Sequence, residues 1–497
     1  MENADVLEKK PVPERPGDSE EEVAVVQDGT VVNAAGYKDQ LQRQYGLIGL
    51  AGIALTVDNA WVALGSSISV SILNGGPAGL LYGLIVAIFY YSFIGLGLAE
   101  ITANISVSMY AVYHEDSFTS QPWQIYVAYL LILLLAAALV ILANRLVPYT
   151  QHLGMFFVIV GGLVTIIVVA AMPHQRPTNA AVWKHFHENN LTGWQDGVAF
   201  LLGVLNGAFT IGTPDAITHM AEELPRPKRD LPRAIGLQLG LGFLYAFCFA
   251  ICIFYSFADL SVLQDGSVNS YPLASIYQLA TSHADGSPNL GATFGLLFIV
   301  WASSMLCCVG TVLTTSRIYW ALARDNAVPL SGLFGRVNES LSCPVYATLF
   351  VSVVAAGLGA IPLGSNTAFL DLTGSFIILT TVSYAIAFGA NVCSGRKYFP
   401  RGPFHLGRYG TAINILSIIF IVFFDIMYCF PYAMPTTVSG MTYNSVILVG
   451  VVCLTTIWWF AHAIRHYPGP KVMGLYIGDT DHTGQQENFV ADPAGEK

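Results

Sequence analysis

Long apolar runs separated by short polar segments make up most of the chain. A bilayer core is crossed by about 20 mainly apolar helical residues. Segments that meet this test lie near 46 to 72, 77 to 103, 124 to 143, 150 to 172, 197 to 221, 233 to 258, 290 to 320, 344 to 362, 367 to 391, 410 to 431 and 444 to 464. The pattern predicts an all-α integral membrane protein, a bundle of about eleven spans.

The two ends of the chain are polar. The first 45 residues are rich in Glu, Pro and Asp and begin with no charged-then-apolar signal peptide, which predicts a disordered cytosolic N-terminal tail over 1–45. The transmembrane domain is then expected over 46–464, and a cytosolic C-terminal tail over 465–497.

Composition supports the membrane assignment. Hydrophobic residues make up 54% of the chain and charged residues 11%, whereas a soluble protein carries roughly a quarter charged residues. The net charge of -10 argues against a nucleic-acid surface. The apolar composition makes the lipid bilayer the expected environment. Six of the eight cysteines lie in apolar runs, and no metal-ligand spacing occurs. We therefore expect no metal or cofactor, and without a clustered His or nucleophile pattern no enzyme.

Basic residues fall in alternate connections, as cytosolic loops of membrane proteins do. They gather near 226 to 233, 317 to 336 and 396 to 408, whereas 259 to 288, 363 to 366 and 432 to 443 hold none. Counting backward from the 226 to 233 loop places 173 to 196 outside, which suits the sequon at Asn190. Counting forward from a cytosolic tail places the connection 104 to 123 on the opposite side, so the two counts differ by one crossing. This connection contains no Lys or Arg that could decide between them. An external N-terminus, a miscounted span or an absent helix would each explain the odd count.

Two spans carry signs of a broken helix. In the span near 197 to 221, Gly212 is followed by Thr213 and a proline, a helix N-cap and a favoured first residue. In the first span, Gly52 precedes the polar Thr56. Broken helices within a membrane are tolerated where they line a cavity, and transporters use their ends to hold polar substrates. The alternative is that these glycines only allow close helix packing.

Charged residues follow the second predicted break. Asp215, His219 and Glu222 have the spacing of one α-helical face, and Glu223 lies beside them. A buried acid is costly, so Asp215 is a candidate for substrate binding and proton coupling. Glu222 and Glu223 are expected at the cytosolic surface, where they would pair with the basic run that begins at Arg226, either as a gate or as a solvated face.

Asp58 is a carboxylate in an otherwise neutral span, which makes it a functional candidate. It could bind a substrate ammonium, or it could cap a helix that restarts between Thr56 and Asn59. Trp61 could present its ring to an amine or a quaternary ammonium, or it could only pack. The substrate-binding candidates are therefore Gly52, Thr56, Asp58, Trp61, Gly212, Thr213 and Asp215, and the coupling or gating candidates are His219, Glu222, Glu223 and Arg226.

Several motifs resemble one family of transporters. They are Leu73 to Leu80 with Ala99-Glu100, Pro214-Asp215 with Leu231-Pro232-Arg233-Ala234, Ser316-Arg317 with Ala323-Arg324-Asp325, and Phe430-Pro431 with Met441 to Asn444. Together they resemble the fungal amino acid/choline transporter branch of the amino acid, polyamine and organocation (APC) permeases, which includes carriers of γ-aminobutyrate (GABA) and choline. The resemblance covers nearly the whole chain from residue 46 onward.

The resemblance implies a LeuT-like fold of two inverted five-helix repeats plus two helices, with the first and sixth helices broken around the substrate. Between Glu100 and Trp123 roughly one helix of the family pattern, the third, is missing, which would explain the odd count. It implies a secondary carrier of amino acids, GABA or choline that works by alternating access, with proton coupling as an option. The plasma membrane is favoured over the vacuolar membrane. The alternative is a non-transporting isoform or sensor that keeps the permease fold.

Overall fold

The structure is a computed structural model, and it describes residues 25–27, 30–32, 45–66, 77–78, 80–82, 84, 109, 121–211, 216–224, 227–257, 271–395, 407–437 and 441–467. The chain divides into two compact units. One comprises Leu41–His466, and the other comprises Met1–Gln40 with Tyr467–Lys497.

The described part of the terminal unit is a short hairpin. Strands β1 (Val25–Gln27) and β2 (Thr30–Val32) pair antiparallel, with Val25 opposite Val32. Asp-Gly between runs of β-branched residues is a strong hairpin signal. This hairpin differs from the structureless tail that the composition of the first 45 residues predicts.

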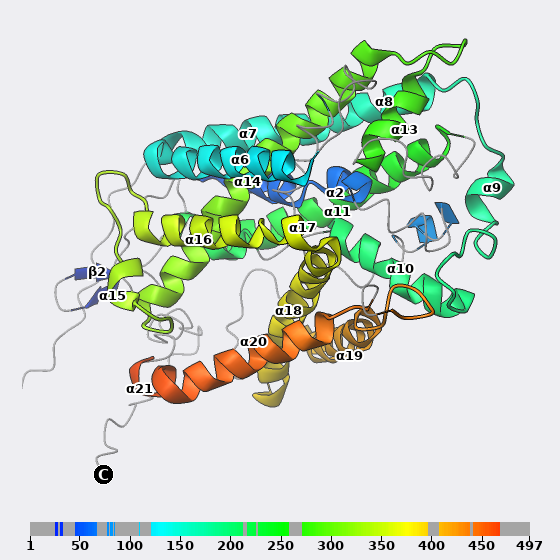
Figure 1. Ribbon diagram of the computed structural model, residues 1–497. Helices are drawn as coiled ribbons and strands as arrows, with labels where there is room; N and C mark the ends of the chain where they lie inside the picture. Colours follow the sequence, from blue (N-terminus) through cyan, green and yellow to red (C-terminus); the bar gives the residue numbers. More distant parts are fainter. Residues whose placement is uncertain are drawn as a thin grey trace, which may run out of the picture. The chain divides into compact units, whose positions relative to one another are not determined.

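Helices make up the described part of the larger unit, with short turns between them (Figure 1). Those that build its first half are α1 (Leu47–Asp58), α2 (Ala60–Ser66), α6 (Pro122–Leu142), η1 (Asn144–Leu146), α7 (Val147–Phe156), η2 (Phe157–Gly161), α8 (Gly162–Ala171), α9 (Asn179–Trp183), α10 (Asp196–Ile211) and η3 (Thr218–Glu223). Those of the second half are α11 (Pro227–Phe254), α13 (Pro272–Thr281), α14 (Leu290–Arg324), α15 (Ser331–Phe334), α16 (Val345–Leu358), α17 (Ile361–Gly364), α18 (Asn366–Cys393), η4 (Gly407–Tyr409), α19 (Gly410–Tyr428), α20 (Asn444–Trp458), η5 (Trp459–Ala463) and α21 (Ile464–His466).

Nine of the described helical segments are long and apolar enough to cross a membrane. They are Leu47–Gly65, Pro122–Leu142, Asn144–Ala171, Arg229–Phe254, Leu290–Arg324, Val345–Gly364, Gly374–Cys393, Gly410–Tyr428 and Asn444–His466. A shorter apolar helix, α10, occupies the predicted span near 197 to 221, and the span near 77 to 103 lies mostly outside the described residues. The prediction of a multi-span α-helical membrane protein is confirmed.

Local sequence explains where the helices begin. The Gln121 and Gln124 side chains form a capping box at the start of α6, and Pro122 occupies the first position. Asn289 caps α14 by accepting a hydrogen bond from the Ala292 N–H at 3.1 Å. These caps satisfy amides that helix ends leave without a partner.

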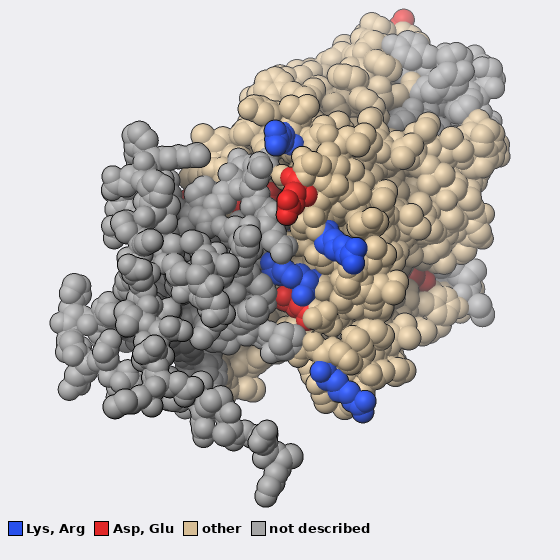
Figure 2. All heavy atoms as spheres, turned by 90° about the vertical axis from the view of Figure 1, so that its left-hand side faces the viewer, with Lys and Arg blue, Asp and Glu red and all other residues tan. Residues whose placement is uncertain are grey.

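The first span is the most buried of the nine, and the last span is among the least buried. The buried core joins α1 and α2 to α10, α11, α13 and α14. Helix α20 lies beside α18 and exposes most of its apolar side chains, as a lipid-facing helix does (Figure 1). Over the described part of the face drawn in Figure 2, most of the Lys, Arg, Asp and Glu side chains gather in one strip near the middle of the view, and the wide surface beside it carries very few.

Helix α13 lies in a connection that sequence reasoning treats as an uninterrupted loop. Its apolar side chains Leu273, Ile276 and Tyr277 are fully buried, and it packs against α14. The span that follows η1 also differs from a simple helix, because η2 is a π-helical turn between α7 and α8. Such turns contain an extra residue and often lie at functional sites.

Candidate functional site

The first span is interrupted at Asn59. Helix α1 ends at Asp58, Asn59 adopts the left-handed conformation with φ 41° and ψ 45°, and α2 starts at Ala60. Asparagine is one of the few non-glycine residues that tolerate this conformation. The predicted break in the first span is therefore confirmed, and it consists of a single residue.

Asp58 lies at this break with 3% of its surface exposed. Among the described residues its Oδ1 atom is buried without a hydrogen-bond partner. The Gln238 side chain on α11 lies near the carboxylate, and both of its polar atoms are also buried without a hydrogen-bond partner in the described part of the chain. Charged groups are rarely buried unless they are paired, so this carboxylate is suited to binding a cationic group.

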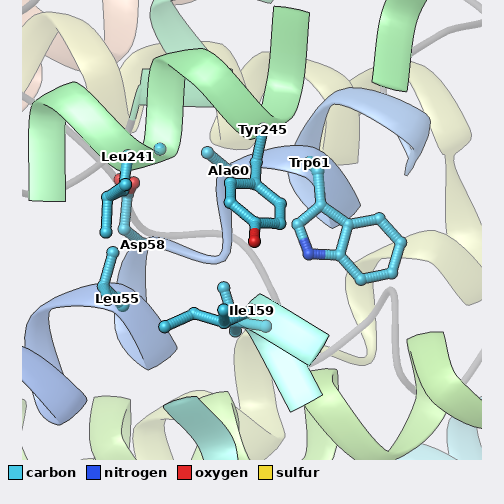
Figure 3. Close-up of a pocket in the computed structure, with 9 residues that line it drawn as sticks. Leu55, Asp58, Ala60, Trp61, Ile159, Leu241 and Tyr245 are labelled. Carbon is cyan, nitrogen blue, oxygen red and sulfur yellow. The ribbon is translucent and has the colours of Figure 1, made fainter. Parts of the chain in front are cut away.

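The Trp61 indole faces the same region. Its ring nitrogen is buried and has no hydrogen-bond partner among the residues that the structure describes, and its ring contacts Phe249 edge to face, with ring centroids 5.2 Å apart. A side chain at Gly162 would meet both the Trp61 nitrogen and the Tyr245 ring at 3.0 Å, so these two rings converge on one point. Figure 3 shows Tyr245 and Trp61 on one side of the break and Asp58 close by.

Asp58, Trp61 and Tyr245 line one small pocket. Leu55, Ala60, Val158, Ile159, Leu241 and Gly242 complete its lining. Its volume is about 10 Å³, which is room for one water molecule and too little for an amino acid. In this structure the pocket is closed to a molecule of that size.

Thr56 and Gly52 have packing contacts with α7. The Thr56 hydroxyl donates to the Gln151 carbonyl at 3.3 Å, and a Cβ on Gly154 would lie 2.4 Å from Thr56. Gly52 lies inside the unbroken α1, where an added Cβ would meet the Gln151 carbonyl oxygen at 3.3 Å. Gly52 is thus away from the break and serves close helix packing, the alternative raised above.

Helix α14 supplies polar partners to the break. The Ser303 hydroxyl donates to Asn59 Oδ1 at 2.9 Å, and the Cys307 thiol donates to the Val57 carbonyl at 3.3 Å. Within the described part of the chain, the Asn59 Nδ2 group is buried without a partner. Helix α14 therefore holds the break in place but does not satisfy all of its polar atoms.

The second predicted break lies partly outside the described residues. Helix α10 ends at Ile211, and the next described helix, η3, begins at Thr218. Gly212, Thr213, Asp215 and Arg226 lie outside the described residues, as does the side chain of Glu222. The α-helical spacing assumed for His219 and Glu222 is wrong, because η3 is a 3₁₀ helix with three residues per turn. His219 is exposed on it.

Glu223 is buried instead of lying at the surface. It accepts a hydrogen bond from Arg317 Nε at 2.8 Å, and both side chains are nearly inaccessible. The expected pairing of Glu223 with the basic run after Arg226 is therefore wrong. The reason is that α14 brings a guanidinium into the core, where a carboxylate must balance it.

The pair belongs to a wider network. Arg317 Nη2 donates to Asn144 Oδ1 at 3.3 Å, and Asn144 Nδ2 donates to the Ser342 carbonyl at 2.9 Å. Burial and then the charge of Glu223 raise the pKa of Tyr45 far above its usual range, while Arg317 lowers it. Tyr45 precedes α1, so the start of the broken span meets η3 and α14 at this network.

Sequence reasoning missed the contribution of α11. Gln238, Gly242 and Tyr245 lie in a helix whose pattern marks it only as a span. A single glutamine in an apolar run was the available signal. The Arg317 pairing gave no local signal, since 94 residues separate it from Glu223.

Comparisons with known proteins agree with this architecture. The sequence profile of the amino acid permease family matches residues 82–453. A choline transporter of Saccharomyces cerevisiae is 26% identical, over 89% of this chain and 84% of its own length. The amino-acid permease BAT1 of Arabidopsis thaliana is 25% identical, over 90% of this chain and 97% of its own length.

Among solved structures, a Na⁺-coupled sialic acid symporter aligns with a TM-score of 0.42 and 12% identity, covering 78% of this chain and 91% of the symporter chain. This similarity is too low to bear on the fold. The family match spans most of the chain, and the resemblance carried by the sequence motifs is confirmed. The chain belongs to the amino acid permease family and is an integral, multi-pass secondary transporter.

Proposed function

We propose that this transporter carries amino acids or related small amines, and that Asp58 binds the substrate's ammonium group at the α1–α2 break. The observation that carries the proposal is the buried Asp58 carboxylate, whose Oδ1 atom lacks a partner. A substrate cation would supply the charge that burial of this acid requires. The relatives named for choline and amino acid transport make such a substrate plausible.

The surrounding aromatic rings support an amine. Trp61 and Tyr245 line the same pocket as Asp58. Aromatic faces attract ammonium and quaternary ammonium groups, and the attraction grows when water is excluded. The Asp58 carboxylate would bind the positive charge of the substrate. The two rings would select for the size and shape of the groups on the substrate's nitrogen.

Transport by alternating access needs a barrier on each side of the substrate site, and only one of the two barriers opens at a time. The Glu223–Arg317 pair joins η3 to α14 beside the start of α1, at the end of the bundle that the basic loops place in the cytosol. We assign this network the role of an inner closure. Opening it would separate the start of α1 from α14 and give the Asp58 pocket a path to the cytosol.

Proton coupling through Asp215, with His219, Glu222 and Arg226 as nearby groups, stays a prediction, as do roles for Gly212 and Thr213. Location in the plasma membrane, in preference to the vacuolar membrane, is part of the proposal. A fluorescent fusion expressed in yeast would report that location directly. An uncoupler that leaves uptake unchanged would contradict proton coupling.

Uptake in a permease-deficient yeast tests the substrate assignment. Labelled choline, GABA and a panel of amino acids are offered to cells with the wild-type protein or Asp58→Asn. Loss of one partner of a buried charge pair costs about 2–5 kcal/mol, so uptake of the preferred substrate should fall roughly 30-fold or more. The matched control is Asp285→Asn, which changes an exposed loop acid.

Two outcomes would contradict the proposal. Equal uptake by Asp58→Asn and wild type would remove Asp58 from the binding site. No uptake of any compound by correctly targeted wild-type protein would favour a non-transporting isoform or sensor.

A further inference from the structure

A second group of buried polar side chains lies away from the Asp58 pocket, where α18, α19 and α20 meet. Asp371 and Ser375 come from α18, and Thr442 and Asn444 come from the connection into α20. Each of these four side chains has at most 1% of its surface exposed. The charge pattern places this end of the bundle outside the cell.

Among the described residues, Asp371 has no basic side chain beside it. Both carboxylate oxygens are buried without a hydrogen-bond partner in that part of the chain, and the Tyr443 backbone N–H lies near them. The sequence contains no Lys or Arg between residues 337 and 395 or between 409 and 464. The three helices that meet here therefore offer no basic side chain over these stretches, and an isolated buried carboxylate is costly.

The neighbouring groups supply oxygen atoms. Thr442 Oγ1 is buried without a hydrogen-bond partner. The Asn444 amide is held in place, because its Nδ2 donates to the Tyr428 carbonyl at 2.9 Å, and its Oδ1 accepts from Ser375 Oγ at 3.1 Å. Burial and then the negative charge of Asp371 raise the pKa of the Tyr432 hydroxyl to about 12, although the nearby Asn444 side chain lowers it.

Gly374 allows these polar groups to approach α18 closely. A Cβ at this position would lie 2.9 Å from Asn444 Nδ2 and 3.1 Å from the Tyr432 hydroxyl. A larger side chain here would push the Asn444 amide and the Tyr432 hydroxyl away from their present positions.

We propose that Asp371, Thr442 and Asn444, with the Tyr432 hydroxyl, form a binding site for a small monovalent metal cation such as Na⁺. Oxygen donors favour hard cations over the softer transition metals. One carboxylate balances one positive charge, which favours a monovalent ion over Ca²⁺ or Mg²⁺. This site is separate from the substrate pocket, and the proposal does not depend on which solute is transported.

Thermal unfolding of the purified full-length protein in detergent tests the site. Na⁺ is the probe, added to 100 mM in place of N-methyl-D-glucamine at constant pH and ionic strength. A ligand that binds only the folded state stabilises it, so the wild-type Tm should rise by about 2 °C or more. Asp371→Asn should lose this rise, and Gly374→Ala should reduce it.

Asp425→Asn is the matched control. Asp425 is also a buried acid of this region, but it accepts a hydrogen bond from the Thr381 hydroxyl at 2.9 Å. This variant should keep the Na⁺-dependent rise. Because the readout is binding, its failure would leave the transport proposal intact.

Two results would overturn the site. One is a wild-type Tm that does not respond to Na⁺, including the case in which it responds only to pH because Asp371 carries a proton. The other is an Asp371→Asn protein that folds and keeps the wild-type rise. Since Gly374→Ala retains the carboxylate, it tests the site even if Asp371→Asn does not fold.

Discussion

Two buried carboxylates of this transporter, Glu223 and Asp58, have opposite surroundings. Glu223 is paired with Arg317 at 2.8 Å, and the guanidinium reaches further partners on η1 and near α16. Asp58 has a buried oxygen without a partner, and the Gln238 and Trp61 groups around it lack partners too. In the first region the buried charges are paired within the protein. In the second, polar groups stay without hydrogen-bond partners among the described residues.

The two regions show two roles for a buried charged group, one in stabilising the fold and one in binding a ligand. A buried pair of opposite charges holds helices together. If one member is removed, the other charge stays buried in the apolar core without compensation. An unpaired group lowers stability and is kept where a ligand completes it. Substitutions in the first region should therefore lower stability as well as disturb the inner closure, whereas those in the second should lower uptake and leave stability largely unchanged.

The largest effect is expected from Arg317→Ala. Leaving a buried partner charge uncompensated costs about 3–5 kcal/mol, so we expect a sharp fall in Tm and in the amount of folded protein. Size-exclusion chromatography of a fluorescent fusion measures both. The double variant Arg317→Met with Glu223→Leu should recover much of the loss.

Arg324→Ala serves as the control for this prediction. Arg324 lies on the same helix, is partly exposed and stacks over the Trp320 ring at 4.9 Å, a contact worth about 0.5–1 kcal/mol. A Tm for Arg317→Ala no lower than that of Arg324→Ala would show that the buried network does not hold these elements together.

A smaller effect, on uptake alone, is expected from Gly242→Ala. The added Cβ would lie 2.7 Å from Asp58 Oδ2, so the carboxylate must move. Displacement of a binding group by a fraction of an ångström should lower kcat/KM for uptake about 10-fold. The folded amount should stay near wild type, because alanine favours a helix over glycine.

Gly240 provides a matched control on the same helix. A Cβ there meets nothing within 4 Å, so Gly240→Ala should leave uptake unchanged. Equal loss of uptake in both variants would mean that α11 responds to helix propensity and not to contact with Asp58.

The smallest effect is expected from Trp61→Phe. Phenylalanine keeps an aromatic ring against Phe249 but removes the indole N–H, which has no hydrogen-bond partner among the described residues. Stability should be unchanged, and uptake should fall about 3-fold if that N–H meets the substrate, which corresponds to a hydrogen bond of modest strength. Trp123→Phe, at an exposed position, is the control. Unchanged uptake in Trp61→Phe would assign the indole to packing alone.

Hydropathy predicted most of the described spans, because a run of about 20 apolar residues is visible in the local sequence. The run predicted near 410 to 431 is Gly410–Tyr428, and that near 444 to 464 is Asn444–His466. The buried helix α13 was missed although Leu273, Ile276, Tyr277 and Ala280 have helical spacing, since the length test for a span excludes ten residues. The break in the first span was also predictable, because its polar residues stand out in an apolar run.

The partners of buried charge were not predictable. Polar residues near Asp58 come from α11, and Arg317 comes from α14, far from Glu223 in sequence. Local spacing instead suggested that Glu223 would pair with the nearby basic run. Only the packing of distant helices decides which acid is satisfied and which is left unpaired.

The π-helical turn η2 has a consequence for how the bundle can move. It joins α7, which touches α1 through Gln151, to α8, whose Gly162 faces Trp61 and Tyr245. Such a turn interrupts the regular hydrogen-bond ladder of a helix and is a common place for a bend. We therefore expect α7 to move together with the start of the first span during transport, while α8 keeps its contacts with the two rings.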